Sequence, residues 1–152
     1  MAAAAVEPTR RLLFDAVARM IACTAGLSTE ELRWAPPIRG ANSIASIIGH
    51  ALGALEQNVI ESLCLVDAVE RDREAEFAAI DATEAAMAER WRALRPRLDA
   101  ALEALTPADL DGSRPHPRFG AMDGHELLTR AVTHIHEHTG QAELTRQLFE
   151  AR

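Results

Sequence analysis

The sequence predicts an all-α protein, a four-helix bundle with a long crossover between its second and third helices. Ala, Leu, Glu and Arg dominate the composition, Tyr is absent, and no alternating β-branched run occurs. Apolar residues recur instead at spacings of three and four, the periodicity of a helix with one buried face. At 152 residues with 48% apolar content, the chain has the size of one domain, so we expect residues 1–152 to form a single domain.

The first helix is expected from about Thr9 to Ala25, with Gly26 as its C-cap. Residues 28–31, Ser-Thr-Glu-Glu, have the pattern of a capping box and predict a short turn of helix. Pro36 and Pro37 should end this turn, because proline lacks the backbone N–H that a helix interior needs.

The second long helix is expected to begin after Asn42 or Ser43, both good N-cap residues, and to reach about Leu65. Residues 66–80 are rich in Asp, Glu and Arg, which favours a solvated connection with some helical character. An extended chain covers about 3.3 Å per residue, so this stretch can run back along the bundle. The third helix can therefore lie parallel to the second.

The third helix is expected to begin at the capping pattern of residues 81–84 and to reach Leu105, with Pro96 as a kink on its outer face. Residues 106–122 are rich in Pro and Gly and predict one long irregular segment. A last capping box at residues 123–126 begins the fourth helix.

The fourth helix carries His134 and His138, which are one turn apart and therefore project side by side. Two imidazoles at this spacing can hold one metal ion. His136 lies between them in sequence but roughly 160 to 200° away around the helix, so it faces elsewhere. A divalent metal needs at least one more donor, which the rest of the chain must supply.

His50, on the second helix, is the candidate for that donor. Glycines at positions 49 and 53 leave open space near its ring, which a metal and a small ligand could fill. The same glycines also fit a plainer interpretation, a close helix contact beside a partly exposed histidine. If the second and fourth helices are neighbours, His50, His134 and His138 form a set with the fourth position open, as in catalytic metal sites.

Two glutamines are candidates for supporting the ligands. Gln141 lies one turn after His138 and could hydrogen-bond a ligand imidazole or a metal-bound water, although an ordinary contact between helices would also explain it. Gln57 lies in the neighbourhood of His50 on the second helix.

The remaining histidines are not expected to belong to the metal site. His116 stands between two prolines and is expected to be exposed, and His125 lies far around the surface from the histidine pair. The order His-x-x-Glu-His at residues 134–138 also matches inverted zinc metalloproteases, in which Glu137 would be the general base. Only fourteen residues follow His138, too few for the further ligand and the larger domain that those enzymes need.

Composition excludes several classes of function. A net charge of -7 argues against a general nucleic-acid binder, because such a protein needs a basic face for phosphates. The first residues lack the pattern of a signal peptide, and no apolar run approaches the roughly 20 residues of a membrane helix, so we expect a cytoplasmic protein. Cys23 and Cys64 fall near the ends of two successive predicted helices, too far apart for a disulfide, and are expected to be free thiols.

These motifs together resemble the DinB superfamily, including its YfiT-like members. The likeness covers nearly the whole chain, and its most specific part is an early histidine combined with a late His-x-x-x-His-x-Gly-Gln element. The residues that carry it are Trp34, Pro36, Asn42-Ser43-Ile44, His50, and His134-x-x-x-His138-x-Gly140-Gln141.

The resemblance implies a bundle with a long crossover, frequent homodimers, and a zinc or nickel ion on three histidines. By carry-over these are His50, His134 and His138. It also implies an activity class, since relatives include transferases and isomerases that use low-molecular-weight thiols such as bacillithiol or mycothiol.

Three functions are consistent with such a site. The first is a metal-dependent transferase in which the ion binds an external thiol and presents a thiolate to a small electrophilic substrate. The second is a metal-dependent hydrolase that uses bound water and needs a nearby general base. The third is a dimeric bundle that binds metal or a small ligand without turnover.

The sequence leaves the metal and the substrate contacts open. Three histidines suit zinc, nickel, copper or iron(II). The carboxylates of a thiol cofactor could be recognised by Arg10, Arg11, Arg39 or Arg118, and the sequence does not rank them.

Overall fold

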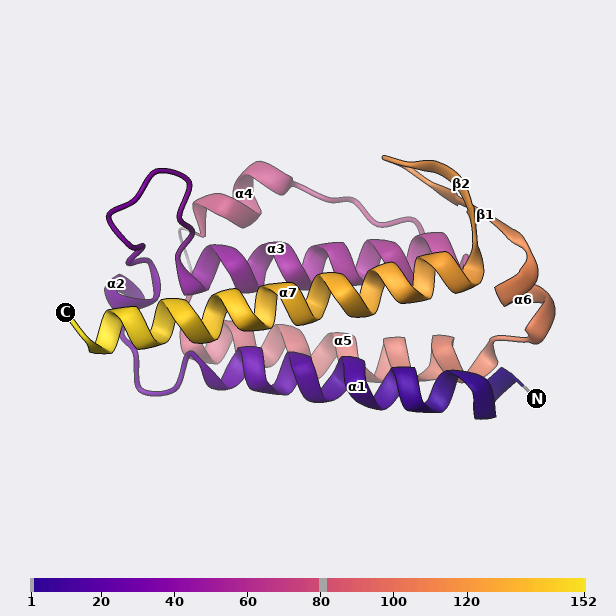
Figure 1. The fold of residues 1–152 in the computed structure, drawn as a ribbon, viewed down its shortest axis with the longest axis horizontal. Helices are drawn as coiled ribbons and strands as arrows, with labels where there is room; N and C mark the ends of the chain where they lie inside the picture. Colours follow the sequence, from indigo (N-terminus) through magenta and orange to yellow (C-terminus); the bar gives the residue numbers. More distant parts are fainter. Residues whose placement is uncertain (1, 80–81) are drawn as a thin grey trace.

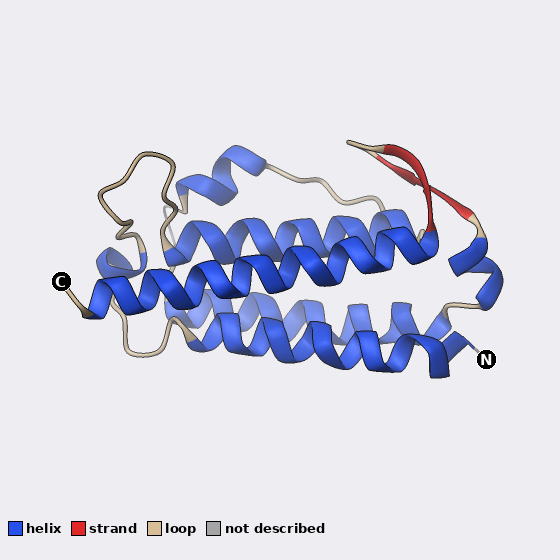
Figure 2. Cartoon of the chain, in the orientation of Figure 1, coloured by secondary structure: helices blue, strands red, loops and turns tan. Residues whose placement is uncertain are grey.

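The structure is a computed structural model that describes residues 2–79 and 82–152, and it is mostly helical (Figure 2). Two short antiparallel strands, β1 (Ser113–His116) and β2 (Gly120–Asp123), form a hairpin. The helical elements are α1 (Ala2–Ala22), α2 (Thr29–Leu32), α3 (Ile44–Glu56) with its π-helical continuation η1 (Gln57–Leu63), α4 (Arg73–Ala78), α5 (Glu84–Ala104), α6 (Pro107–Asp111) and α7 (Gly124–Glu150). The helical content agrees with the all-α prediction, and the hairpin is the exception.

The long helices α1, α3, α5 and α7 lie side by side (Figure 1). Helix α7 packs against both α1 and α3, and α5 packs against the same two helices. Helices α3 and α5 run in the same direction, opposite to α1 and α7 (Figure 1). The predicted neighbourhood of the second and fourth long helices, α3 and α7, is therefore present.

The buried faces of α3 and α7 follow the predicted helical periodicity. Their buried residues include Ile44, Ile48, Ala51 and Leu55 on α3 and Leu128, Ala131, Ile135 and Ala142 on α7. Burial of such side chains contributes about 1.5–3 kcal/mol each for the larger ones, and it orients both helices. The polar residues beside these stripes then point into the groove between α3 and α7.

Side-chain caps begin the long helices close to the predicted positions. Ser43 caps α3 by accepting the backbone N–H of Ser46 at 3.1 Å, and Thr83 caps α5. Asp81, part of the predicted capping pattern for α5, lies outside the described residues. Helix α1 begins at Ala2 rather than near Thr9, since alanine has the highest helix propensity and the first residues are nearly all alanine.

The second long helix changes its hydrogen-bonding pattern after Glu56. The π-helical segment η1 closes with a hydrogen bond from the Cys64 N–H to the Val59 carbonyl at 2.8 Å. π-Helical turns occur frequently at functional sites. Here η1 contributes Gln57 and Asn58 to the wall of a cavity described below.

The crossover after η1 is less solvated than its charge predicts. Helix α4 lies along α3 (Figure 1), and the side chain of Glu76 is only 9% exposed. Gly49 and Gly53 make this approach possible: a Cβ atom at Gly49 would lie 3.0 Å from the backbone oxygen of Glu76, and one at Gly53 would collide with its carboxylate. The close contact of the plainer interpretation is therefore present, but His50 beside it is buried at 8% exposure rather than partly exposed.

Residues 106–122 are ordered rather than one irregular segment. Thr106 and Asp109 form a capping box for α6. The strands then pair in register, with Arg114 opposite Met122, and Gly120 has the positive φ (76°) that favours glycine. Within residues 2–79 and 82–152, no helix is both long and apolar enough to cross a bilayer.

Candidate metal centre

His134 and His138 meet on one face of α7. Their Nε2 atoms are 3.1 Å apart, and their ring centroids are 4.3 Å apart. Ile135 and Thr139, both buried, hold this part of the helix against its neighbours, and the Thr139 hydroxyl donates to the Ala16 carbonyl of α1 at 3.0 Å. His136 is exposed on another face, as its spacing predicts.

His50 reaches the same point from α3. Its ring centroid is 5.3 Å from that of His134 and 5.0 Å from that of His138. One ligand nitrogen from each of the three histidines can be chosen so that all lie within 4.8 Å of one another. The three predicted residues therefore come together from two helices and could hold a metal ion.

The distance between His134 and His138 fits two ligands of a single ion, and His50 lies within reach of both. Two nitrogens bound to one tetrahedral ion at 2.0–2.1 Å would be separated by roughly 3.3 Å, close to the 3.1 Å between the two Nε2 atoms on α7. The Nδ1 atom of His134 is buried and has no hydrogen-bond partner among the described residues. Neutral imidazole donors of this kind suit zinc, nickel, copper and iron(II), so the ligand type alone does not select the metal.

Two of the rings are held in the neutral form that binds metals. Burial lowers the pKa of His50 to about 3, assisted by His138 and Arg71. Burial also lowers the pKa of His134 to about 4, again assisted by His138 and Arg71. Both imidazoles therefore offer a lone pair at neutral pH without first losing a proton.

Gln141 lies in contact with a candidate ligand. Its Oε1 atom is 2.8 Å from Nδ1 of His138, so Nδ1–H donates and Nε2 is left as the donor atom toward the centre. Gln57 does not contact a histidine; its Oε1 atom accepts from Arg71 at 3.4 Å. The two glutamines thus act in different places, one on α7 and one beneath the crossover.

The crossover supplies a support for His50 that the sequence did not indicate. Arg71 lies 2.9 Å from Nδ1 of His50 and donates to its carbonyl oxygen at 3.2 Å, while Glu76 binds Arg71 at 2.8 Å. Phe77 stacks on the His50 ring with centroids 4.7 Å apart. The signal for this packing was the Gly49 and Gly53 pair, which admits another segment, but the sequence does not say which one.

The arrangement also constrains the proton on His50. Because a guanidinium can only donate, Nδ1 accepts from Arg71 and the neutral ring carries its proton on Nε2. Ligation through Nε2 requires the proton on Nδ1 instead. The Oε2 atom of Glu76 is 3.6 Å from Nδ1, beyond hydrogen-bond distance, and would accept this proton after a small approach, as in carboxylate–histidine–metal arrangements.

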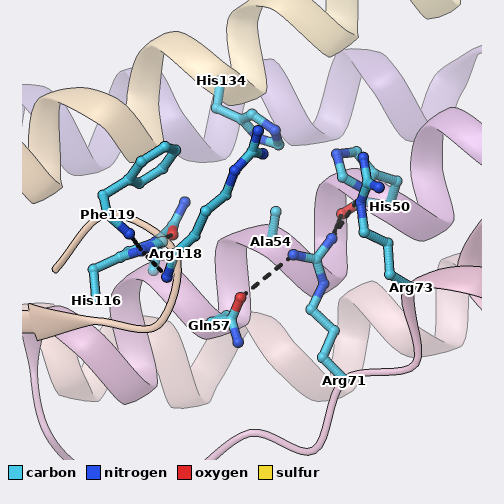
Figure 3. A pocket seen from close by; sticks show the side chains of 10 residues that line it. His50, Ala54, Gln57, Arg71, Arg73, His116, Arg118, Phe119 and His134 are labelled. Carbon is cyan, nitrogen blue, oxygen red and sulfur yellow. Dashed lines mark hydrogen bonds between the residues drawn. The ribbon is translucent and has the colours of Figure 1, made fainter.

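A cavity of about 400 Å³ opens in front of His50 and His134 (Figure 3). Its walls come from α3 and η1, from the crossover, from the hairpin and from α7. The lining residues are His50, Ala54, Gln57, Asn58, Arg71, Arg73, His116, Arg118, Phe119 and His134. Of the described residues that line it, none is an Asp or Glu.

Comparisons with known proteins agree with this fold. The model of the DinB superfamily matches residues 13–142. The chain belongs to the DinB superfamily. A protein from Enterococcus faecalis, solved by crystallography and described as a conserved protein, shares the fold at 17% identity with a TM-score of 0.75 over 97% of this chain and 98% of that chain. No curated protein matches.

In this DinB chain, His116 lies buried between the hairpin and η1. The prediction of an exposed residue is wrong, since the side chain is buried at 8% exposure. Nδ1 accepts the backbone N–H groups of Arg118 and Phe119 at 3.1 and 3.2 Å, and Nε2 lies 2.9 Å from Oδ1 of Asn58. The proton is therefore on Nε2, and the ring ties the hairpin turn to η1.

Two of the four arginines that the sequence could not rank lie in different parts of the structure. Arg118 lines the cavity of this DinB protein, whereas Arg10 pairs with Glu7 and Asp99 on another surface. Arg71 and Arg73, which the sequence analysis assigned to a solvated connection, line the cavity as well. His125 is exposed and lies 3.3 Å from Asp111, away from the cavity.

Proposed function

We propose that this DinB protein is a divalent-metal-dependent transferase that uses an external low-molecular-weight thiol, of the bacillithiol or mycothiol type, on a small electrophilic substrate. His50, His134 and His138 would hold the ion, with zinc or nickel as the best candidates. When bound, such an ion lowers the pKa of a coordinated thiol and so supplies a thiolate nucleophile. The observation that carries the proposal is the meeting of three ligand nitrogens within 4.8 Å, where two of the three histidines, His50 and His134, line an open cavity.

The cavity favours an external thiol over activated water. A hydrolase needs a general base beside the metal-bound water. No described residue that lines this cavity carries a carboxylate, and Glu137, which lines an adjoining pocket with His134, is exposed. His116 is the other lining group that could take a proton, but both of its nitrogens are engaged. A free thiol has a pKa of about 8.5, far below that of water, so a metal-bound thiol loses its proton with less help from a base. We therefore rank the hydrolase second.

The thiol must come from outside the chain. Cys23 and Cys64 are both free, as expected, and neither lines the cavity. Burial raises the pKa of Cys64 to about 12 and also raises the pKa of Cys23. Both are poor nucleophiles for this reason.

The proposal includes a quaternary arrangement. We take α1, α3 with η1, α5 and α7 as the four helices of a DinB-type bundle and expect a homodimer. Leu144 and Leu148, one turn apart on α7, are 55% and 43% exposed, which supports a contact with a second copy on that face. Sedimentation equilibrium should give twice the chain mass, and Leu144→Glu with Leu148→Glu should give the monomer; a monomeric parent would contradict the expectation.

The first test is metal content, measured by mass spectrometry on tag-free protein. We expect near-stoichiometric zinc or nickel in the parent and loss of it in His50→Ala and His138→Ala. His136→Ala is the matched control, since this exposed histidine lies on the same helix outside the site. Parent protein that stays metal-free when offered zinc or nickel would refute every metal-dependent function.

The second test asks whether a thiol reaches the ion. Cobalt(II)-loaded protein should develop a sulfur-to-metal charge-transfer band on addition of thiol, and this band should disappear in His138→Ala. Stoichiometric metal that raises the melting temperature, without a charge-transfer band or turnover, would instead support the non-catalytic binding protein.

A further inference from the structure

The cavity is basic although the protein is acidic. The whole chain has a net charge of -7, yet Arg71, Arg73 and Arg118 line the cavity and no described lining residue is acidic. The ligand that enters this space therefore meets a local charge opposite to that of the protein as a whole.

Two of the three arginines keep their charge available. Arg71 is neutralised by Glu76. Within the described part of the chain, neither Arg73 nor Arg118 forms an ion pair; the guanidinium carbon of Arg73 lies 5.0 Å from the ring centroid of Phe77, and that of Arg118 lies 5.1 Å from that of Phe119. A guanidinium stacked on a ring keeps its N–H groups in its own plane, free to bind carboxylate or phosphate oxygens.

The two free arginines belong to different walls. Arg73 is the first residue of α4, and Arg118 lies in the turn of the hairpin. Figure 3 shows Arg71 and Arg73 on the side of His50, and Arg118 on the side of His116 and Phe119. His116 links the backbone of Arg118 to η1, so the fold fixes the point from which the second guanidinium extends into the cavity.

We infer that the ligand of this cavity is an organic anion whose carboxylate or phosphate group is bound by Arg73 and Arg118 beside the three histidines. The inference rests on the proposed function for the role of that ligand, as the thiol or the electrophile at the metal. Binding of the anion itself requires only the two arginines. The two parts can therefore fail separately.

The test compares two thiols on cobalt(II)-loaded protein, followed by the charge-transfer band. Mercaptosuccinate carries carboxylates and thioglycerol is neutral. We expect mercaptosuccinate to bind at least about tenfold more tightly, in line with charged hydrogen bonds to a guanidinium. Arg73→Gln and Arg118→Gln should each remove most of this difference.

Arg95→Gln is the matched control. Its guanidinium also lies over a phenylalanine ring, at 5.6 Å from the centroid of Phe14, but it does not line the cavity. It should leave the preference for mercaptosuccinate unchanged. Succinate and glycerol 3-phosphate are then compared as competitors of mercaptosuccinate. The anion that competes better shows whether the arginines prefer a carboxylate or a phosphate group.

The outcomes distinguish the two proposals. Equal affinity for both thiols, or a preference that survives both arginine variants, overturns the anion site and leaves the thiol chemistry intact. If neither thiol gives a charge-transfer band, the thiol function fails, and calorimetry of succinate against succinamide decides the anion site. Succinate binding that both arginine variants lose supports the site, and absence of succinate and glycerol 3-phosphate binding overturns it.

Discussion

The Glu76 carboxylate occupies the space that a side chain at Gly53 would need. Glu76 binds Arg71, and Arg71 contacts Nδ1 of His50. The absence of a side chain on α3 thus allows a charged pair from the crossover to reach the back of a candidate metal ligand. Such supporting groups typically change metal affinity by about 10- to 100-fold.

Gly53→Ala should therefore weaken metal binding without unfolding the protein. The new methyl group must displace the Glu76 carboxylate, which is the group placed to accept a proton on Nδ1 of His50, and we expect a loss of affinity of about tenfold. The free energy of unfolding should change by no more than about 1 kcal/mol, since alanine favours the helix and a glutamate end can move. Competition with a metal-binding dye measures the first quantity, and urea denaturation the second. Unchanged metal affinity would show that the pair does not support His50.

Gly140→Ala is the companion variant with the opposite expectation. Gly140 lies inside α7, and a Cβ atom there would meet nothing within 4 Å. The substitution should raise the free energy of unfolding by about 0.5–1 kcal/mol through helix propensity alone. Metal affinity should stay at the parental value. A loss of stability in urea denaturation would mean that this face of α7 is covered by another chain.

The helical periodicity of the sequence predicted the histidine positions because they depend on local geometry. The four-residue spacing of His134 and His138 places them together on any helix. His50 needed one further condition, contact between α3 and α7, which the apolar stripes of both helices indicated. These relationships follow from patterns within single helices.

The groups that the sequence missed depend on contacts between distant segments. Arg71 and Glu76 appear as a solvated charge run, since nothing local shows that glycines on α3 admit them. His116 appears as an exposed loop residue because its partner, Asn58, is 58 positions away and faces the hairpin only after η1 changes the helical pattern. The hairpin itself has no alternating apolar pattern that would have predicted strands.

Acid should destabilise the metal-free protein through the histidines. The pKa of His50 is lowered to about 3 and that of His134 to about 4, below the ordinary 6.5 that applies when the chain is unfolded. Below pH 6.5 the unfolded chain takes up protons that the folded chain does not, so stability is fully present above this pH and falls as the pH drops toward 4.

The expected loss between pH 7 and pH 5 is on the order of 2 kcal/mol for each of these histidines. Urea denaturation at both pH values, in the presence of a chelator, gives the quantity directly. His50→Gln should reduce the pH dependence, whereas the exposed His136→Gln should retain it. Equal pH dependence in the parent and His50→Gln would contradict the assigned protonation state.

His116→Ala should loosen the hairpin. The substitution leaves the N–H groups of Arg118 and Phe119 without their acceptor and removes the link to Asn58, a loss of about 1–3 kcal/mol. Amide hydrogen exchange should accelerate in residues 113–123 and remain unchanged in α1. His125→Ala, an exposed histidine at the start of α7, is the control. Protection of the hairpin at the parental level would show that β1 and β2 hold the turn without the imidazole.

Gln141→Ala should weaken metal binding through His138. Oε1 of Gln141 accepts from Nδ1 of His138, which fixes the ring and makes Nε2 the donor atom. Without this acceptor the ring can rotate or place its proton on Nε2, and we expect about a tenfold loss of metal affinity. Gln147→Ala, an exposed glutamine on the same helix, should bind metal like the parent. Because Gln141 is itself exposed, both variants should unfold at the same urea concentration. A change in metal affinity without a change in stability would show that Gln141 orients His138. Equal metal affinities in the two variants would show that Gln141 does not contribute to metal binding.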